Sequence, residues 1–260
     1  MDIYADFNDK RYLDYDSTGM PVAALAEDCP DGYDSPRHSH PSAQLIYAVR
    51  GVMVVSAAAG QWIVPPSRGL WMPGNTLHSI RMAGAVQMRT AFIDSTIAAS
   101  MLQHCAVLKI SPLLRELILA LIEMPIPYAA DSKAGHIAQL LLEEIQDMRA
   151  LPLHLPMPSD ARLLRICTAL SADPGDNTTA AQWAGQLNID AKTIHRLFLR
   201  ETGLTFGQWR TEARLLFALE RLAAGEKILN IALDLGYESP SAFTTMFKKQ
   251  FGVSPSRFFA

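Results

Sequence analysis

The stretch Ala232–Ser254, "ALDLGYESPSAFTTMFKKQFGVS", decides the carboxyl-terminal fold because an earlier stretch repeats its pattern. The earlier copy, Ala184–Thr205, reads "AGQLNIDAKTIHRLFLRETGLT" and aligns with it when one extra residue is allowed in the second turn. Each copy predicts a helix, a tight turn, a second helix and a terminal glycine. Gly203 and Gly252 would supply the left-handed residue that commonly ends a helix. The pattern therefore predicts a duplicated helix-turn-helix.

The second helix of each copy has one apolar and one polar face. Asp190 and Ser239 stand where these helices should begin, and Pro240 suits a first helical position. The residues predicted to pack inward are Ile194, Leu197 and Phe198 in one copy and Phe243, Met246 and Phe247 in the other. The residues left outside are Lys192, Thr193, His195 and Arg196, and Ser241, Thr244, Thr245 and Lys248. Such donors suit reading of base edges in the major groove. The alternative is an ordinary helical bundle with a polar surface, but two copies in register favour DNA binding.

The segment Ile231–Phe259, "IALDLGYESPSAFTTMFKKQFGVSPSRFF", resembles the signature of the AraC/XylS-type bacterial transcriptional regulators, and the resemblance extends back to about Asn177. It implies two recognition helices that enter successive major-groove segments of a double-stranded DNA operator, about one helical turn (roughly 34 Å) apart. Carried over by position, Lys192, His195 and Arg196 should read bases from the first helix, next to the outward Thr193, and Ser241, Thr244 and Thr245 from the second. Arg200, Lys248 and Lys249 are candidates for phosphate contacts, and the alternative is that each is the ordinary charged residue of a solvated helix end. We expect Arg196 to read a guanine, and the second helix, with small residues at its start, mainly to position the domain.

The amino-terminal part has a different pattern. Short apolar runs separated by Gly and Pro, from about Val22 to Ile93, predict an all-β sandwich or barrel. Within it, "HSHPSAQLIYAVRG", His38–Gly51, sets two histidines two residues apart and Gln44 four residues further on, and "LWMPGNTLHSI", Leu70–Ile80, adds a second block. These blocks resemble the two cupin motifs, with Gln44 where many cupins have Glu. The resemblance implies a double-stranded β-helix barrel.

Three interpretations of this barrel remain open. His38, His40, Gln44 and His78 could hold a divalent metal, Zn, Ni, Fe or Mn, that serves as a signal. The same residues could line a small-molecule effector pocket, or simply hydrogen-bond inside the barrel, with Tyr47, Trp62 and Trp71 as apolar walls; we favour this interpretation over the metal at this point. The rival from another class is a cupin metalloenzyme with a helical appendage. Only neutral ligands would surround its metal, and fusion to a DNA-binding module disfavours turnover.

The chain organisation predicts an α+β protein in four parts. Residues 1–110 are expected to form the cupin-like effector-sensing barrel, and residues 111–149 two amphipathic connector helices, each started by a serine. Residues 150–159, rich in proline, predict a semi-rigid linker, and residues 160–260 the all-α domain with two helix-turn-helix motifs. In the family resembled, such connector helices commonly pair two subunits, which predicts a homodimer. The alternative is that their apolar stripes pack only on their own barrel.

Composition limits the remaining possibilities. The 260 residues are 49% hydrophobic and 19% charged, an ordinary globular composition, and the net charge is -3. No apolar run approaches the roughly 18 residues of a membrane span, and the amino end has no basic and apolar leader, so we expect a cytoplasmic protein without membrane partners. The cysteines, Cys29, Cys105 and Cys167, lie far apart and predict no disulfide framework. The sequence thus predicts a regulator, not an enzyme, whose unknown effector shifts the population of DNA-binding or RNA polymerase-contacting arrangements.

Overall fold

The computed structural model describes residues 18–66, 68–148, 150–151 and 154–258, which form two compact units. The first unit comprises the described residues up to Ala57 and from Val64 to the end of β7 (Ala150–Leu151). The second comprises Ala58–Ile63 and the described residues from His154 onward. Among the helices that the structure describes, none has the length and apolar character needed to cross a membrane.

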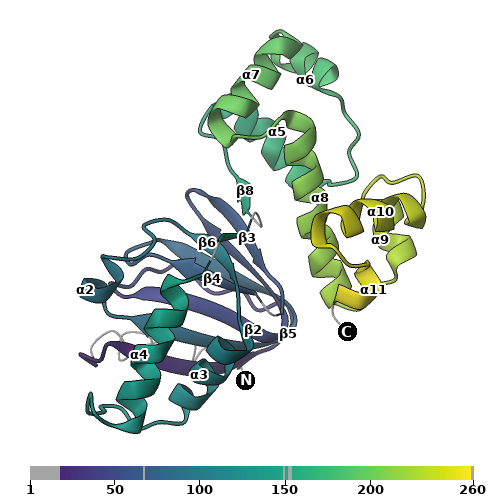
Figure 1. The fold of residues 1–260 in the computed structure, drawn as a ribbon. Helices are drawn as coiled ribbons and strands as arrows, with labels where there is room; N and C mark the ends of the chain where they lie inside the picture. The colour runs from purple at the N-terminus through teal and green to yellow at the C-terminus, as the bar shows by residue number, and fades with distance from the viewer. Residues whose placement is uncertain (1–17, 67, 149, 152–153, 259–260) are drawn as a thin grey trace, which may run out of the picture. The chain divides into compact units, whose positions relative to one another are not determined.

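The first unit is built on an antiparallel β-sheet with the strand order β1-β5-β2-β4-β6-β7 (Figure 1). Its strands are β1 (Val22–Cys29), β2 (Ala43–Ala57), β4 (Arg68–Met72), β5 (His78–Ile93), β6 (Ala106–Lys109) and β7. The long strands β2 and β5 pair along most of their length, with register shifts around Arg50. Gly51 lies within this irregularity at a φ of 79°, and a Cβ there would come within 2.6 Å of the Ala85 carbonyl oxygen, so this position requires glycine.

Helices α3 (Pro112–Ile122) and α4 (Lys133–Gln146) lie against one face of this sheet (Figure 1). They begin as the sequence predicts, because Ser111 and Ser132 accept hydrogen bonds from backbone amides in the first turns. Their apolar stripes pack on the sheet in one core, whose helical members include Leu114, Leu117, Ile118, Leu121, Ala138, Leu141 and Ile145. Leu113 and Leu140 remain the exposed large apolar side chains of the two helices. The apolar stripes therefore pack on the sheet of their own unit, which is the alternative that the sequence offered to a dimer interface.

The second unit is mainly helical, as predicted for the residues after Asp160. Its helices are α5 (Ala161–Ala172), α6 (Ala180–Leu187), α7 (Ala191–Thr202), α8 (Phe206–Ala223), α9 (Ile228–Asp234), α10 (Pro240–Phe251) and α11 (Pro255–Phe258). Gly203 and Gly252 end α7 and α10 in the left-handed conformation, as the repeat predicts. Ser239 caps α10 with its side chain, whereas Asp190 occupies the cap position of α7 without a side-chain hydrogen bond. The repeat therefore forms two helix pairs, α6 with α7 and α9 with α10.

The proline-rich segment contains a strand that the sequence did not predict. Strand β8 (His154–Pro156) pairs with β3 (Gly60–Val64), and the rings of His154 and Trp62 stack with centroids 4.6 Å apart. Trp209 of α8 donates its indole hydrogen to the carbonyl of Pro156, at 2.7 Å. This segment is thus fixed to the helical unit by strand pairing and by a hydrogen bond from α8.

Candidate functional site

Helix α7 has one polar face and one buried face, which packs against aromatic side chains of α8. Ile194, Leu197 and Phe198 are at most 3% exposed, and Phe198 contacts the rings of Phe206 and Trp209 in α8. On the opposite face Lys192, His195 and Arg196 are exposed and Thr193 is half-buried. All four predicted contact residues of this helix therefore share a face that a duplex can approach, on a helix held firmly by aromatic packing.

Helix α10 also has a buried aromatic face and a polar outer face, but the outer face begins with smaller side chains than that of α7. Phe243 and Phe247 are fully buried, whereas Met246 is only half-buried, so the inner face is narrower than predicted. The outer residues are Ser241, Thr245, Lys248 and Lys249, which are exposed, and Thr244, which is half-buried. The two lysines lie in the last turn, where a positive charge also complements the helix dipole.

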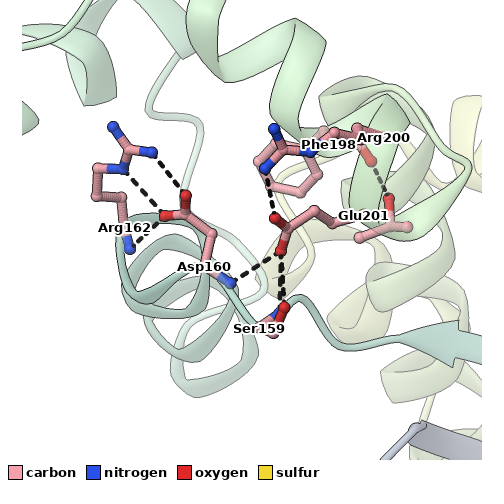
Figure 2. Close-up of polar contacts among 7 residues, drawn as sticks. Ser159, Asp160, Arg162, Phe198, Arg200 and Glu201 are labelled. Atoms are coloured by element: carbon pink, nitrogen blue, oxygen red, sulfur yellow. Dashed lines mark hydrogen bonds and ion pairs between the residues drawn. The ribbon is translucent and has the colours of Figure 1, made fainter.

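The carboxyl end of α7 is tied to the start of α5 by Glu201, a residue that the sequence analysis missed (Figure 2). Its carboxylate accepts hydrogen bonds from the backbone amides of Ser159 and Asp160, at 3.1 and 2.8 Å, and from the Ser159 hydroxyl. Arg200 donates to the other carboxylate oxygen at 2.8 Å. The pKa of Glu201 is lowered below its usual value, most by the hydrogen bond from Arg200 and next by the hydrogen bond from the Asp160 amide. Arg200, a predicted phosphate contact, thus pairs within the protein while its side chain stays 62% exposed.

Arg214, in the middle of α8, holds the loop before α6. It is 8% exposed and donates from Nε to the Pro174 carbonyl at 2.8 Å. Its Nη2 donates to the Asp176 carbonyl and to the side-chain oxygen of Asn177, at 3.2 and 2.9 Å. The guanidinium also lies over the Tyr237 ring, 5.7 Å from its centroid. Arg214 therefore contacts both the loop that leads to α6 and the turn that leads to α10.

That loop and turn approach too closely for side chains. A Cβ on Gly175 would lie 2.4 Å from the Asp234 carbonyl oxygen, and a Cβ on Gly236 would lie 2.8 Å from the Gly175 carbonyl oxygen. Gly236 also has a φ of 73°, which favours glycine. The two helix pairs are consequently joined by α8 and by a tight backbone contact at Gly175 and Gly236.

In the first unit, the three histidines singled out from the sequence come together. His38 and His78 face each other as an isolated antiparallel bridge, with two backbone hydrogen bonds of 2.9 Å, and their ring centroids are 4.2 Å apart. The His40 ring lies 5.5 Å from that of His78 and 6.2 Å from that of His38. One nitrogen from each ring falls in a group in which all the atoms lie within 4.8 Å of one another. Such a spacing fits ligands of one metal ion.

Backbone hydrogen bonds orient the three rings. The Nδ1 atom of each ring lies 2.8 to 2.9 Å from a carbonyl oxygen, and the carbonyls belong to Pro36, Ser42 and Thr76. A carbonyl only accepts, so each Nδ1 carries a proton and each Nε2 of a neutral ring offers a lone pair. The Nε2 atom of His78 is buried without a hydrogen-bond partner among the described residues. Burial lowers the pKa of His78 to about 4, which keeps this ring neutral at pH 7.

Gln44 completes the group as predicted. It is 1% exposed, and its Oε1 lies 3.0 Å from the Nε2 of His40. Thr90, which the sequence analysis missed, orients the amide: its hydroxyl donates to the Leu45 carbonyl and accepts from the Gln44 Nε2 at 2.9 Å. The Gln44 oxygen is thereby directed at the His40 Nε2, with which it shares a hydrogen bond.

The three aromatic residues predicted to line the same site lie elsewhere. Tyr47 and Trp71 are buried in the core beneath α3 and α4, on the sheet face opposite Gln44. The side chains of a strand alternate between faces, so Gln44 and Tyr47, three residues apart, point in opposite directions. Trp62 groups with the second unit, where it stacks on His154. The histidine site is therefore polar and is not walled by these rings.

Comparisons with known proteins agree with both parts of this description. Residues 21–146 match the model of the AraC-like ligand binding domain, and residues 183–260 match that of a helix-turn-helix domain. Among curated proteins, the HTH-type transcriptional regulator NimR of Escherichia coli (strain K12) is 35% identical over 230 residues, which is 88% of this chain and 84% of NimR. The HTH-type transcriptional regulator RipA of Corynebacterium diphtheriae is 35% identical over 112 residues, 43% of this chain and 33% of RipA.

Among solved structures, ToxT from Vibrio cholerae aligns over 92% of this chain and 98% of its own, with a TM-score of 0.39 and 13% identity. The family assignment rests on the sequence matches, which span both units and confirm the resemblance noted in the carboxyl-terminal repeat. The chain therefore belongs to the AraC/XylS family of DNA-binding transcription regulators, and it carries an amino-terminal ligand-binding domain.

Proposed function

We propose that α7 and α10 are the two recognition helices of this regulator and that α7 supplies most of its sequence specificity. The observation that supports this division is the difference between their exposed faces. Lys192, His195 and Arg196 offer long donors on α7, whereas α10 begins with Pro240, Ser241 and Ala242, which are short. An arginine can bond the O6 and N7 atoms of guanine with both arms of its guanidinium, and such a pair discriminates between bases.

In this proposal α10 mainly positions the domain. Its hydroxyl groups reach only shallowly into a groove, while Lys248 and Lys249 at its end suit phosphate contacts, which fix register without reading sequence. Helix α8 and the backbone contact at Gly175 and Gly236 hold the two helix pairs as two helix-turn-helix units. Recognition helices held in this way would read two blocks of one operator about one helical turn apart, roughly 10 base pairs.

For the sensor we propose that a divalent metal ion binds His38, His40 and His78. The support is the convergence of the rings, because one nitrogen from each lies within 4.8 Å of the others and each Nδ1 atom lies at hydrogen-bonding distance from a carbonyl oxygen. Gln44 would contribute its Oε1 atom. Metal-bound histidines usually donate their other ring nitrogen to a carbonyl or carboxylate in this way. The two histidine-bearing blocks also fit the cupin resemblance, which supports a cupin-like barrel around the site.

The donor set indicates which ions would bind. Three imidazoles and an amide oxygen suit Zn, Ni or Fe better than Mn, which prefers carboxylates. All four donors are neutral, so no protein charge offsets that of the ion, and we expect weaker binding than at a site with a carboxylate. Weaker binding makes the ion exchangeable, which suits a signal more than a permanent structural metal.

The metal proposal predicts a specific loss of binding. Protein purified without a histidine tag and dialysed against buffered micromolar Zn²⁺ or Ni²⁺ should bind about one ion per chain, measured by mass spectrometry. His78→Ala should reduce the content to background because it removes a buried ligand whose Nε2 has no other partner among the described residues. His136→Ala, which removes an exposed histidine on α4, serves as the matched control and should bind like the wild type. Equal metal content in wild-type and His78→Ala protein would refute the proposal, and His78→Gln provides a second variant if the alanine substitution fails to fold.

A signal in the first unit can act only if it binds one arrangement of the regulator more tightly than another. We propose that this arrangement alters contact with the operator or with RNA polymerase, and that the regulator acts as a homodimer. The rival, a cupin metalloenzyme, needs the same metal but predicts no sequence-specific DNA binding. The relatives of this chain that are named transcriptional regulators favour the regulator over the enzyme.

A further inference from the structure

A cavity of about 480 Å³ lies in the first unit, on the opposite side of the sheet from Gln44. It is lined by Trp71 of β4, by the segment Ser100–Leu102 after α2 (Ser95–Ala98), and by Ile145, Gln146 and Met148 at the end of α4. Its volume lies within the range of about 300 to 1,000 Å³ that is typical of small-molecule sites. No residue that the proposed metal site uses contributes to its walls.

The wall formed by Ser100–Leu102 is fixed by hydrogen bonds. Trp71 donates its indole hydrogen to the Leu102 carbonyl at 2.7 Å. The Gln103 side-chain amide lies within 3.3 Å of the carbonyl oxygens of Ala98, Ala99 and Met101. These contacts hold the turn in shape before any ligand arrives, which reduces the entropic cost of binding.

The chemistry of the lining defines the ligand class. Met101 and Met148 bring thioethers from two separate segments, and Trp71 and Ile145 add apolar surface, while no lining residue is charged. Thioethers are polarisable and adapt to flat or irregular apolar groups, aromatic rings in particular. Two polar groups remain: Gln146 offers an amide, and the Ser100 hydroxyl, which donates to the Ile97 carbonyl, offers its lone pairs. We propose that this cavity binds a neutral, largely apolar small molecule that forms one or two hydrogen bonds.

The position of the cavity connects such a ligand to regulation. One wall of the cavity lies at the end of α4 and just after it, at Ile145, Gln146 and Met148. The next element along the chain is β7, which pairs with β6, and β6 follows the Ser100–Leu102 segment of the other wall. A ligand that packs against these residues therefore stabilises the end of α4, shortly before the last strand of the first unit. This site is independent of the metal and of DNA, so its failure would leave the proposed function standing.

The test uses the full chain and the neutral fluorescent probe N-phenyl-1-naphthylamine, in a buffer that contains EDTA to exclude any metal site. We expect saturable fluorescence enhancement with a dissociation constant in the micromolar range, about -8 kcal/mol. Ser100→Phe and Gln146→Phe, at exposed positions, place a ring in the cavity and should each raise this constant about tenfold, and the double variant should abolish binding.

Gln139→Phe is the matched control, because Gln139 is an exposed glutamine on α4 that does not line the cavity. It should bind the probe like the wild type. Unfolding temperatures of all variants are measured in parallel, so that a loss of binding is compared only among folded proteins. An absence of saturable binding, or the same dissociation constant in the control and in both filling variants, would overturn the proposal.

Discussion

Arg196→Ala is expected to weaken binding to the selected operator by about 1 to 3 kcal/mol, which is roughly 5-fold to 150-fold, and to relax specificity at one base pair. Arg196 is exposed on α7, while the neighbouring Ile194 and Leu197 hold the helix in the core. The substitution therefore removes the proposed base contact while the residues that hold the helix in the core stay in place. Competition binding against duplexes with each single-base change measures both the loss and the relaxed position.

Two further variants distinguish base reading from general attraction. Arg196→Lys keeps the charge but not the two-armed guanidinium, so it should recover part of the affinity without the base preference. Arg165→Ala removes the same charge from an exposed position on α5, outside both recognition helices, and should change affinity little. If Arg196→Ala weakened all sequences equally, Arg196 would be a phosphate contact and the assignment of its role would be wrong.

Arg214→Met is expected to lower the free energy of unfolding of the second unit by roughly 3 kcal/mol or more. The change leaves the partly buried carbonyls of Pro174 and Asp176 without the charged donor that now satisfies them. It also removes the group that lies over Tyr237, beside the turn that leads to α10. Denaturant unfolding followed by tryptophan fluorescence measures the loss, and Arg165→Met at an exposed site provides the matched control.

The same variant tests how the two helix pairs are held. Because Arg214 contacts the loop before α6 and the turn before α10, its loss should disturb their relative placement. We expect Arg214→Met to weaken binding to a duplex with both operator blocks more than to one with only the block read by α7. The same fold-loss on both duplexes would limit Arg214 to a role in stability.

The helical unit could be predicted closely from sequence because its signals are local. The caps at Ser239 and Pro240, and the glycines that end α7 and α10, act within one helical turn. The apolar spacing of Ile194, Leu197 and Phe198 then determines which face is buried. The grouping of His38, His40 and His78 followed from the blocks that resemble the cupin motifs, whereas the role of this group stays a prediction.

The placement of the aromatic residues was not predictable. Every residue from Ala43 to Ala48 is buried, so the strand shows no alternation between an apolar and a polar face. Only the packing of α3 and α4 on one side of the sheet decides that Tyr47 and Trp71 lie away from the histidines. Apart from Gln44, the residues of both faces are apolar, so the sequence does not show which face the helices cover.

Arg214 and Glu201 were missed for a related reason. Both act on backbone groups that lie about 40 residues away in the chain, and a backbone carbonyl or amide has no sequence signature. The strand β8 depends on pairing with Gly60–Trp62, a partner more than 90 residues earlier. The three prolines of residues 150–159 indicated a linker, whereas this long-range pairing gives part of that segment a strand.

Selection of bound duplexes from a random pool at physiological salt, followed by sequencing, tests the central claim most directly. The pool should be selected with and without Zn²⁺, so that a metal-dependent arrangement is also sampled. We predict an enriched site with two blocks about one helical turn apart, roughly 10 base pairs, and stronger base preference in the block read by α7. Enrichment of a single block would contradict a second recognition helix, and no enrichment under either condition would contradict sequence-specific recognition by these helices.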